Sequence, residues 1–252
     1  MATKPRPPEA LPSEAEARAQ AAELQARFGG AEPARVIAAA AEAFPDRLAA
    51  VSSFGADSAV LLHLIAEVDK SLPIVFLDTG KHFGETLEYR DALVSDLGLS
   101  GLRVVEPEPV ALSLADPRGD LFGADTEACC AVRKVEPMAR GVAPFAAWFT
   151  GRKRFQAATR ASLPVFEAVG PRIRINPLAD WDADRLAAYA DAHALRLNPL
   201  VPYGYLSIGC FPCTRAVEAG ENARAGRWAG QAKTECGIHL SGLDRSLTSA
   251  SL

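Results

Sequence analysis

Five cysteines are the residues whose types and spacing could do chemistry in this chain. Cys129 and Cys130 are adjacent, Cys210 and Cys213 form a Cys-Phe-Pro-Cys group, and Cys236 stands near the C-terminal end. Neighbouring cysteines form only a strained disulfide with each other, whereas a Cys-x-x-Cys pair reaches one metal centre at two points. If the two pairs meet in the fold, four thiolates suit a zinc ion or a [4Fe-4S] cluster equally well. Buried thiols that merely pack are the simple alternative, which the combined spacing disfavours.

The fifth cysteine, Cys236, is left over once the two pairs are formed. The glycine that follows it suits a thiol that must visit two partners, although an incidental exposed cysteine is the simple alternative. No apolar run approaches the ~20 residues of a membrane span, and the N-terminal stretch lacks the apolar core of a signal peptide. We therefore expect a cytoplasmic protein whose thiols stay reduced and act as ligands or reactive groups.

A glycine turn lies between an apolar run and a helical pattern at residues 52–58, in the sequence Ser-Ser-Phe-Gly-Ala-Asp-Ser. Gly55 lets the backbone turn tightly, and the hydroxyls of Ser53 and Ser58 can donate hydrogen bonds. The unpaired N–H groups at the start of the helix favour a phosphate. The alternative is an ordinary turn in which Asp57 or Ser58 caps the helix.

Short apolar runs alternate with longer amphipathic ones from residue 47 onward, which predicts a β-α-β-α-β order. Right-handed connections then give an α/β fold with a doubly wound, mostly parallel sheet and helices on both faces. Ligands of such sheets bind at the carboxyl ends of the strands, near the switch point. Expected strands cover 48–54, 72–80, 102–107, 146–151 and 172–178, and expected helices cover 14–28, 33–44, 58–68, 85–98, 126–141 and 180–195.

The composition is that of an ordinary globular domain. Of 252 residues, 49% are hydrophobic and 23% are charged, which excludes extensive disorder and low-complexity polymers. The formal net charge of -4 argues against a surface that coats nucleic acid, so any anion site must be local. We expect neither nucleic acid nor a membrane among the partners.

The glycine turn resembles the PP-loop of ATP pyrophosphatases, Ser-Gly-Gly-x-Asp-Ser, with Phe54 in place of the first glycine. The sulfonucleotide reductases, which act on adenylyl sulfate (APS) or phosphoadenylyl sulfate (PAPS), carry a similarly altered loop and do not cleave ATP. The stretch 77–86, which contains Leu-Asp-Thr-Gly-Lys-His-Phe, and the Glu-Cys-Gly-Ile-His-Leu motif at 235–240 also resemble that family. The resemblance runs from about residue 50 to 240 and implies an adenine nucleotide alpha hydrolase-like fold with a modified PP-loop.

The same resemblance gives the cysteines roles. A Cys-Cys pair with a distant Cys-x-x-Cys is the cluster pattern of the assimilatory, iron-sulfur type of adenylyl-sulfate reductase. It therefore implies a [4Fe-4S] cofactor, rather than zinc, on Cys129, Cys130, Cys210 and Cys213. It also implies that Cys236 is the catalytic nucleophile.

Substrate-binding positions follow from the resemblance as well. A nucleotide sulfate needs an adenine slot and several cations, and arginine suits its oxygens through a bidentate fork. Phe155 and the alanines at 157–158 depart from the family pattern, where Asp and Ser-Pro follow the basic run. The implied set is Ser52 and Leu77 at the adenine, Gly151 near the ribose, the turn residues Ser53, Gly55, Asp57 and Ser58, and the cations Lys134, Arg160, Arg224, Arg227 and His239.

The resemblance further implies a thiol mechanism for the reduction of APS to sulfite and AMP. Cys236 attacks the sulfur, AMP leaves, and thioredoxin frees sulfite from the resulting S-sulfocysteine. Three alternatives stay open: PAPS as the better substrate, a PP-loop ATP pyrophosphatase, and a four-thiolate zinc protein that binds nucleotide. A homo-oligomer is also left open.

We expect three parts along the chain. Residues 1–30 form an N-terminal arm and helix, and residues 31–205 form the nucleotide-binding α/β reductase domain. Residues 206–252 form a loop-rich segment that completes the cluster and carries the catalytic thiol.

Overall fold

The computed structural model describes residues 10–229, 233 and 235–239. A six-stranded sheet lies at its centre, in the order β3-β2-β1-β4-β6-β5. Four strand pairings are parallel, and β5 alone runs antiparallel to its neighbour β6. The strands are β1 (Leu48–Val51), β2 (Ile74–Leu77), β3 (Leu102–Val105), β4 (Ala147–Thr150), β5 (Phe166–Val169) and β6 (Arg172–Ile175). The expected mostly parallel α/β sheet is confirmed.

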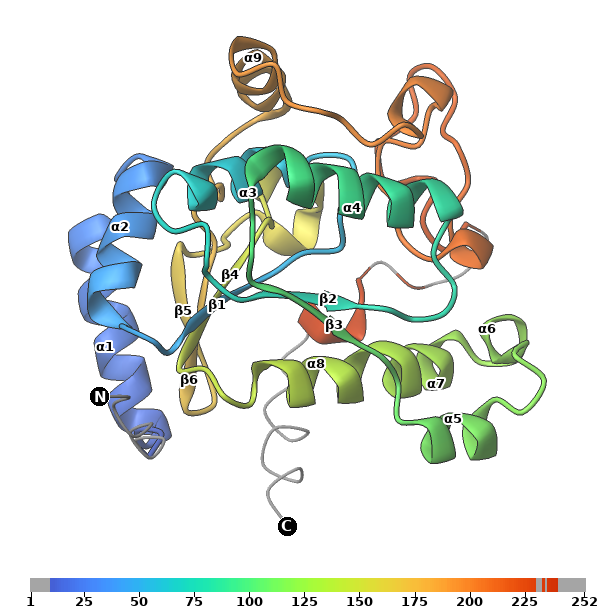
Figure 1. Ribbon diagram of the computed structural model, residues 1–252, viewed down its shortest axis with the longest axis horizontal. Coiled ribbons are helices and arrows are strands. Elements are labelled where there is room, and N and C mark those ends of the chain that lie inside the picture. Colours follow the sequence, from blue (N-terminus) through green and yellow to red (C-terminus); the bar gives the residue numbers. More distant parts are fainter. Residues whose placement is uncertain (1–9, 230–232, 234, 240–252) are drawn as a thin grey trace.

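Helices cover both faces of this sheet, with α3, α4 and α9 on one side and α7 and α8 on the other (Figure 1). The α-helices are α1 (Glu14–Phe28), α2 (Pro33–Ala43), α3 (Ser58–Ala66), α4 (Gly84–Leu97), α5 (Pro109–Ala115), α6 (Leu121–Ala124), α7 (Thr126–Cys130), α8 (Glu136–Val142) and α9 (Ala183–Ala192). Short helical turns are η1 (Ala131–Val135), η2 (Arg154–Gln156), η3 (Ala158–Arg160), η4 (Val201–Tyr203), η5 (Phe211–Cys213) and η6 (Gly237–His239). Among the described residues, no helix has the length and apolar character needed to cross a membrane.

The central strands β1, β2 and β4 are short apolar runs because both of their faces are buried. In β1, Leu48 and Ala50 join the core beneath α1 to α4, whereas Ala49 joins the smaller core beneath α8. Alternate side chains of a strand point to opposite faces, so a strand buried between two helical layers must be apolar throughout. This pattern explains why the sequence predicts these strands well.

The order of the strands reverses next to β1. The chain moves from β1 outward to β2 and β3, then returns to place β4 on the other side of β1, with Val51 paired to Thr150. In a doubly wound sheet this reversal opens a crevice at the carboxyl ends of the two central strands. The segments that follow β1 and β4 are therefore positioned to line a site.

Two local features differ from the expectation. The antiparallel edge strand β5 was not among the predicted strands. The helix expected over 126–141 is divided, because a π-helical turn, η1, lies between α7 and α8. A π turn holds one residue more than an α turn and often occurs at functional sites.

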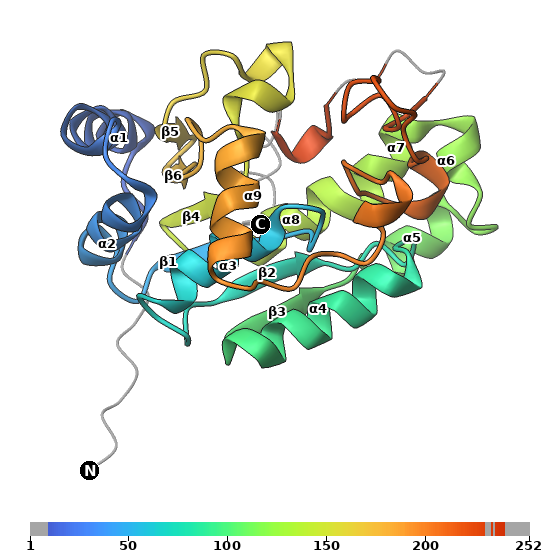
Figure 2. The same cartoon turned by 90° about the horizontal axis from the view of Figure 1, so that it is seen from above.

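The first helix belongs to the main core. Ser13 caps α1 through a capping box, and Ala21 and Leu24 pack into the main core. Helix α1 lies beside β5 (Figure 2). The side chain of Gln25 accepts a hydrogen bond from the backbone N–H of Phe166 in β5. The three-part division of the chain stays a prediction, and the N-terminal tip at residues 1–9 lies outside the described residues.

Candidate active site

A cavity of about 650 Å³ opens at the carboxyl ends of β1 and β4; we call it the central cavity. Its walls come from the turn after β1, the loop after β4, helix α9 and the C-terminal loops. The residues expected on sequence grounds that line it are Ser52, Ser53, Gly55, Asp57, Ser58, Leu77, Lys134, Gly151, Arg160, Arg224, Arg227 and Cys236. His239 ends η6, and its side chain lies outside the described part of the chain.

We call the turn after β1, residues 52–57, the nucleotide turn because of its resemblance to a PP-loop. Phe54 has a φ of 48°, in the left-handed region that favours glycine. Its ring is fully buried and meets Phe76 edge to face at 5.6 Å between centroids. The Oγ of Ser52 accepts a 3.1 Å hydrogen bond from the N–H of Phe54, and Asn198 donates to the carbonyl of Phe54 at 3.0 Å. Core packing and two hydrogen bonds thus hold a conformation that glycine would adopt freely.

Asp57 occupies the N-cap position of α3, but its side chain makes no capping hydrogen bond. The carboxylate instead accepts from Nζ of Lys153 at 2.8 Å and from Gln156 at 3.3 Å. Burial lowers the pKa of Lys153, and the charge of Asp57 opposes that effect. The alternative in which Asp57 caps the helix is therefore wrong, and the carboxylate instead ties the nucleotide turn to the loop after β4.

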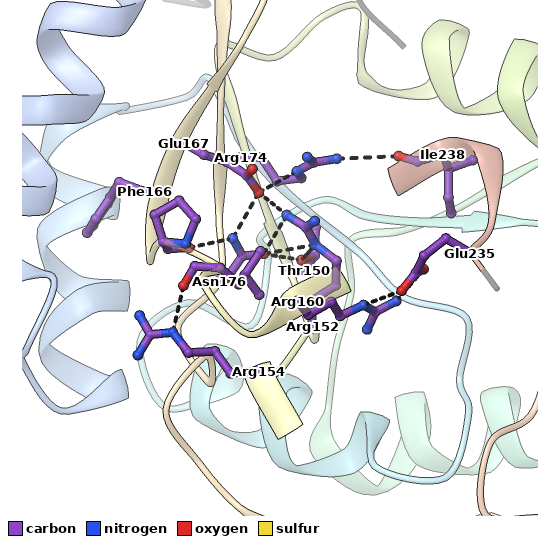
Figure 3. Close-up of polar contacts among 12 residues, drawn as sticks. Thr150, Arg152, Arg154, Arg160, Phe166, Glu167, Arg174, Asn176, Glu235 and Ile238 are labelled. Atoms are coloured by element: carbon purple, nitrogen blue, oxygen red, sulfur yellow. Dashed lines mark hydrogen bonds and ion pairs between the residues drawn. The ribbon is translucent and has the colours of Figure 1, made fainter. Parts of the chain in front are cut away.

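Cationic side chains crowd the central cavity. Glu167 neutralises Arg152 and Arg174, and lies 2.7 Å from the latter (Figure 3). Among the described residues, Lys134 and Arg227 have no carboxylate within ion-pair distance. The full set is Lys134, Arg152, Lys153, Arg160, Arg174, Arg224 and Arg227. Cations in excess of their carboxylates indicate that the cavity takes an anion.

Burial and neighbouring positive charges lower the pKa of two arginines of the cavity. Burial lowers the pKa of Arg152 to about 8, and the charges of Arg174 and Arg160 add to the effect. Burial likewise lowers the pKa of Arg224 to about 10, again with repulsion from Arg160. An anionic ligand would relieve both costs, because it replaces lost water and offsets like-charge repulsion.

Arg227 reaches the cavity past a glycine. A Cβ on Gly209 would lie 2.4 Å from the guanidinium, so a larger residue there would displace it. The ring of Trp228 lies 4.4 Å from the guanidinium carbon, and Nε of Arg227 has no hydrogen-bond partner among the described residues. A buried donor left in this state is ready for an acceptor on a ligand.

The thiol of Cys236 lies in the wall of the central cavity, with the residue only 7% exposed. When Cys130 is a free thiol, its hydrogen bond is the largest influence that lowers the pKa of Cys236. The charges of Lys134 and Arg227 act in the same direction and do not require a proton on Cys130. Burial opposes them. The thiolate is the nucleophilic form of cysteine, so this surrounding favours attack by Cys236.

The residues on either side of Cys236 are held by arginines of the cavity wall (Figure 3). The carboxylate of Glu235 accepts from Nε and Nη2 of Arg160, each at 2.8 Å, and lies 3.7 Å from Arg224. Two residues after the cysteine, the carbonyl of Ile238 accepts from Arg174 at 3.4 Å. We call residues 235–239 the thiol segment.

The four remaining cysteines line a second, small pocket beside the cavity, which we call the thiol pocket: Cys129, Cys130, Cys210 and Cys213. Thr79 Oγ1 lies 3.3 Å from the sulfur of Cys210. Three of the four thiols are buried, and none of the described cysteines forms a disulfide. Within the described residues, no three metal-binding side chains come close enough together for a single ion. The structure thus brings the two pairs together in the lining of one pocket.

Lys134 joins the two sites, because its side chain lines both the central cavity and the thiol pocket. It lies in the π turn η1, between the cysteine-bearing helix α7 and the sheet-packed helix α8. Burial opposes its charge, yet the thiols of Cys236, Cys210 and Cys130 raise the pKa of Lys134 above its ordinary value. The ammonium is therefore charged, and it lines both the thiol pocket and the cavity whose wall contains Cys236.

A sequence model of the phosphoadenosine phosphosulfate reductase domain matches residues 47–216 of this chain. The chain belongs to this family. The adenosine 5'-phosphosulfate reductase of Mesorhizobium japonicum is 65% identical over 254 residues, which cover 100% of both proteins. Proteins of the same name from Chelativorans sp. and Deinococcus radiodurans are 61% and 45% identical, over 99% and 94% of this chain and 100% and 91% of their own.

Solved structures agree with the family. The PAPS reductase of Candida auris, crystallised with phosphate, is 28% identical, with a TM-score of 0.67 over 79% of this chain and 97% of its own. The FMN adenylyltransferase of Candida glabrata, in complex with FMN and an ATP analogue, is similar in fold alone. It is 16% identical, with a TM-score of 0.50 over 85% of this chain and 69% of its own.

Several residues of this reductase-family site were missed from the sequence. Arg152 and Lys153 follow β4 directly and are buried, and a basic run at the end of a predicted central strand could have revealed them. Glu235 lies in the Glu-Cys-Gly-Ile-His-Leu motif, which could have revealed it, although its partner Arg160 is distant in sequence. Arg174 gave no such signal, because its strand shows only an alternating pattern. Asn198, which fixes the nucleotide turn, lies in a loop without any motif.

Proposed function

We propose that this chain reduces adenylyl sulfate to sulfite and AMP in assimilatory sulfate reduction. The observation that carries the proposal is the buried thiol of Cys236 in a cation-lined cavity at the switch point of the sheet. Relatives of at least 61% identity over nearly the whole chain carry the name adenosine 5'-phosphosulfate reductase, which supports APS as the substrate. The function places the protein in the cytoplasm, where its thiols stay reduced.

The cavity suits the parts of the substrate. Backbone groups of the nucleotide turn with Leu77 and Gly151 receive the adenosine, and the excess cations receive the phosphosulfate. The charges of Lys134 and Arg227 lower the pKa of Cys236 and therefore act on the sulfur that reacts. Cations fixed where negative charge develops on a leaving group are among the strongest contributions to catalysis.

The reaction proceeds in two displacements. The Cys236 thiolate attacks the sulfur of APS, a sulfur–sulfur bond forms, and the bond from sulfur to the phosphate oxygen breaks. AMP leaves with that electron pair, and S-sulfocysteine remains on the chain. A dithiol protein such as thioredoxin then attacks the Cys236 sulfur and releases sulfite. Its second thiol resolves the mixed disulfide, so the dithiol is oxidised and the sulfate sulfur gains two electrons.

The four cysteines that line the thiol pocket are the donor set of a [4Fe-4S] cluster, which takes one thiolate on each of its irons. Their Cys-Cys and Cys-x-x-Cys spacing resembles the cluster pattern of the adenylyl-sulfate reductases, which favours the cluster over a zinc ion. Cys129, Cys130, Cys210 and Cys213 would hold it, and the neighbouring charge of Lys134 complements an anionic metal–thiolate group. When bound, the cluster would supply a fixed charge beside the cavity and hold α7 against η5.

Sulfite release from APS and thioredoxin, measured on protein purified without oxygen, tests the function. We expect turnover with a higher kcat/KM for APS than for PAPS, and no pyrophosphate release from ATP. Cys236→Ser should abolish sulfite release and keep the iron content of the protein. A higher kcat/KM for PAPS than for APS would identify the chain as a PAPS reductase instead. Retained turnover in Cys236→Ser would show that Cys236 is not the nucleophile.

A further inference from the structure

Cys236 is held from both sides within four residues of chain. Glu235 precedes it and Ile238 follows it by two positions, and both contact arginines of the cavity wall (Figure 3). Arg160 and Arg174 lie on η3 and β6, elements that belong to the folded core. The position of the sulfur therefore depends on two anchors outside the thiol segment.

The stronger anchor is the pair of Glu235 and Arg160, whose side chains are 8% and 7% exposed. The guanidinium gives Nε and Nη2 to the carboxylate and Nη1 to Gln156 at 2.7 Å. Thr159 adds a 3.3 Å hydrogen bond to the same carboxylate. A bidentate arginine–carboxylate pair fixes orientation as well as distance.

This use of Arg160 divides the cations of the cavity into two groups. Arg160 and Arg224 contact the carboxylate of Glu235, whereas Lys134 and Arg227 line the same cavity as Cys236 without a contact to that carboxylate among the described residues. The first group is occupied by the chain itself. The second group is the one free of carboxylates among the described residues.

We propose that Glu235 is a positioning residue for the first displacement, which rests on the function proposed above. Its bidentate pair with Arg160 holds the thiol segment so that the Cys236 sulfur lies in the cavity, in line with the bond that breaks. Arg174 supports the far side through the carbonyl of Ile238. The competing assignment makes Glu235 a rival of the substrate anion for Arg160 and Arg224.

The experiment compares the Glu235→Gln and Glu235→Asp variants with the wild type under single-turnover conditions at saturating APS. Formation of S-sulfocysteine on the Cys236 peptide is followed by mass spectrometry, and AMP affinity and Tm are measured beside it. A misplacement of about 1 Å costs about 100-fold in rate, so we expect a 10- to 100-fold slower step in Glu235→Gln, with AMP affinity within about 3-fold. Glu235→Asp keeps the charge and should recover part of the loss.

Glu221→Gln is the matched control. Glu221 forms a bidentate pair with Arg215 through Nη1 and Nη2, at 2.9 Å for both contacts, in the same C-terminal region, and is not among the residues that line the central cavity. Its rate should stay at the wild-type value. An unchanged rate together with tighter APS binding in Glu235→Gln would make Glu235 a competitor of the substrate. A loss of rate explained wholly by a loss of folded protein would leave it a structural residue.

Alkylation of Cys236 by iodoacetamide gives a readout that needs no turnover. Release of the thiol segment should raise the labelling rate of Cys236 at least about 10-fold in Glu235→Gln, because the sulfur leaves its buried position. Labelling at the wild-type rate would overturn the proposal. If the wild type forms no S-sulfocysteine, the proposed function fails, and the labelling rates still decide whether Glu235 positions the thiol.

Discussion

Nζ of Lys153 lies 2.8 Å from the carboxylate of Asp57, across 96 positions of sequence. The contact joins the nucleotide turn after β1 to the loop after β4. The switch point is thus closed by an ion pair as well as by the strand pairing beneath it. Because the lysine side chain is only 3% exposed, its charge depends on the carboxylate of Asp57 for stabilisation.

The first prediction concerns this pair. Asp57→Asn leaves a buried ammonium without its counter-charge, so we expect a loss of about 1–3 kcal/mol in the free energy of unfolding. Asp57→Asn combined with Lys153→Met should cost less than the sum of the single changes, measured by urea unfolding. The exposed pair of Arg118 and Asp120 serves as the control, and additive losses at the buried pair would contradict the coupling.

The second prediction concerns Phe54, which stands where a PP-loop has its first glycine. Phe54→Gly empties a fully buried site, for which large-to-small changes cost about 3–5 kcal/mol, but it relieves the left-handed φ by about 1 kcal/mol. We expect a net loss of about 2–4 kcal/mol by chemical denaturation. Phe54→Ala should be less stable than Phe54→Gly, because alanine keeps the backbone strain. Equal stability of the two variants would show that φ does not matter here.

Lys134 should matter for rate more than for folding. Lys134→Met removes a charge that lines both sites and faces Cys236, so kcat/KM for APS should fall about 100- to 1,000-fold. Exposed Lys70→Met is the control and should leave kcat/KM unchanged. Steady-state kinetics checks both, and a fall below about 3-fold in Lys134→Met would remove the lysine from the reaction.

The thiol pocket can be emptied without touching the central cavity. Cys129 lines the thiol pocket but not the central cavity. Cys129→Ser should therefore lose iron and the absorbance of the cluster, while AMP affinity stays within about 3-fold. Iron and acid-labile sulfide analysis with calorimetric AMP titration checks this. Full iron content in the variant would take Cys129 out of the ligand set, and one zinc per wild-type chain would take the cluster out of the proposal.

Acid should weaken the anchor of the thiol segment. Burial alone would raise the pKa of Glu235, but the hydrogen bonds and charge of Arg160, with Arg224, hold it below the ordinary 4.5. A carboxylate of this kind stabilises the fold above pH 4.5, and that contribution is lost as the pH falls through its lowered pKa. The difference in unfolding free energy between wild type and Glu235→Gln should therefore be constant from pH 7 to about 5 and shrink below about 4.5. A difference that grows on acidification would contradict the assignment.

The sequence predicts those parts of the fold that local burial determines. The apolar runs at β1, β2 and β4 are buried on both faces, so their composition alone marks them as central strands. The edge strand β5 escapes this rule, because Glu167 lies in its middle and only half of its residues are buried. The carboxylate of Glu167 forms ion pairs with Arg152 and Arg174. The periodicity of the sequence does not indicate these pairs.

The same distinction holds for the site. Gly55, Lys134 and the cysteines belong to short motifs with recognisable spacing, and they line the two pockets. Arg174 is one of the two polar residues in the alternating Arg-Ile-Arg-Ile pattern of β6. Such alternation indicates a side chain that faces solvent. It is 5% exposed and faces the cavity, because Glu167 and the thiol segment cover it. The thiol segment lies 64 positions along the chain from Arg174, so this contact leaves no local trace in the sequence.

The π turn at Ala131–Val135 holds one residue more than an α turn between the sulfur-bearing α7 and the sheet-packed α8. Because this one turn takes in the extra residue, deletion of one residue within η1 would convert the stretch to regular helix and leave the directions of α7 and α8 nearly unchanged. The side chains inside the turn, Lys134 among them, would change direction instead. A single extra residue thus sets where the lysine points without rotating the cysteine-bearing helix relative to the helix packed on the sheet.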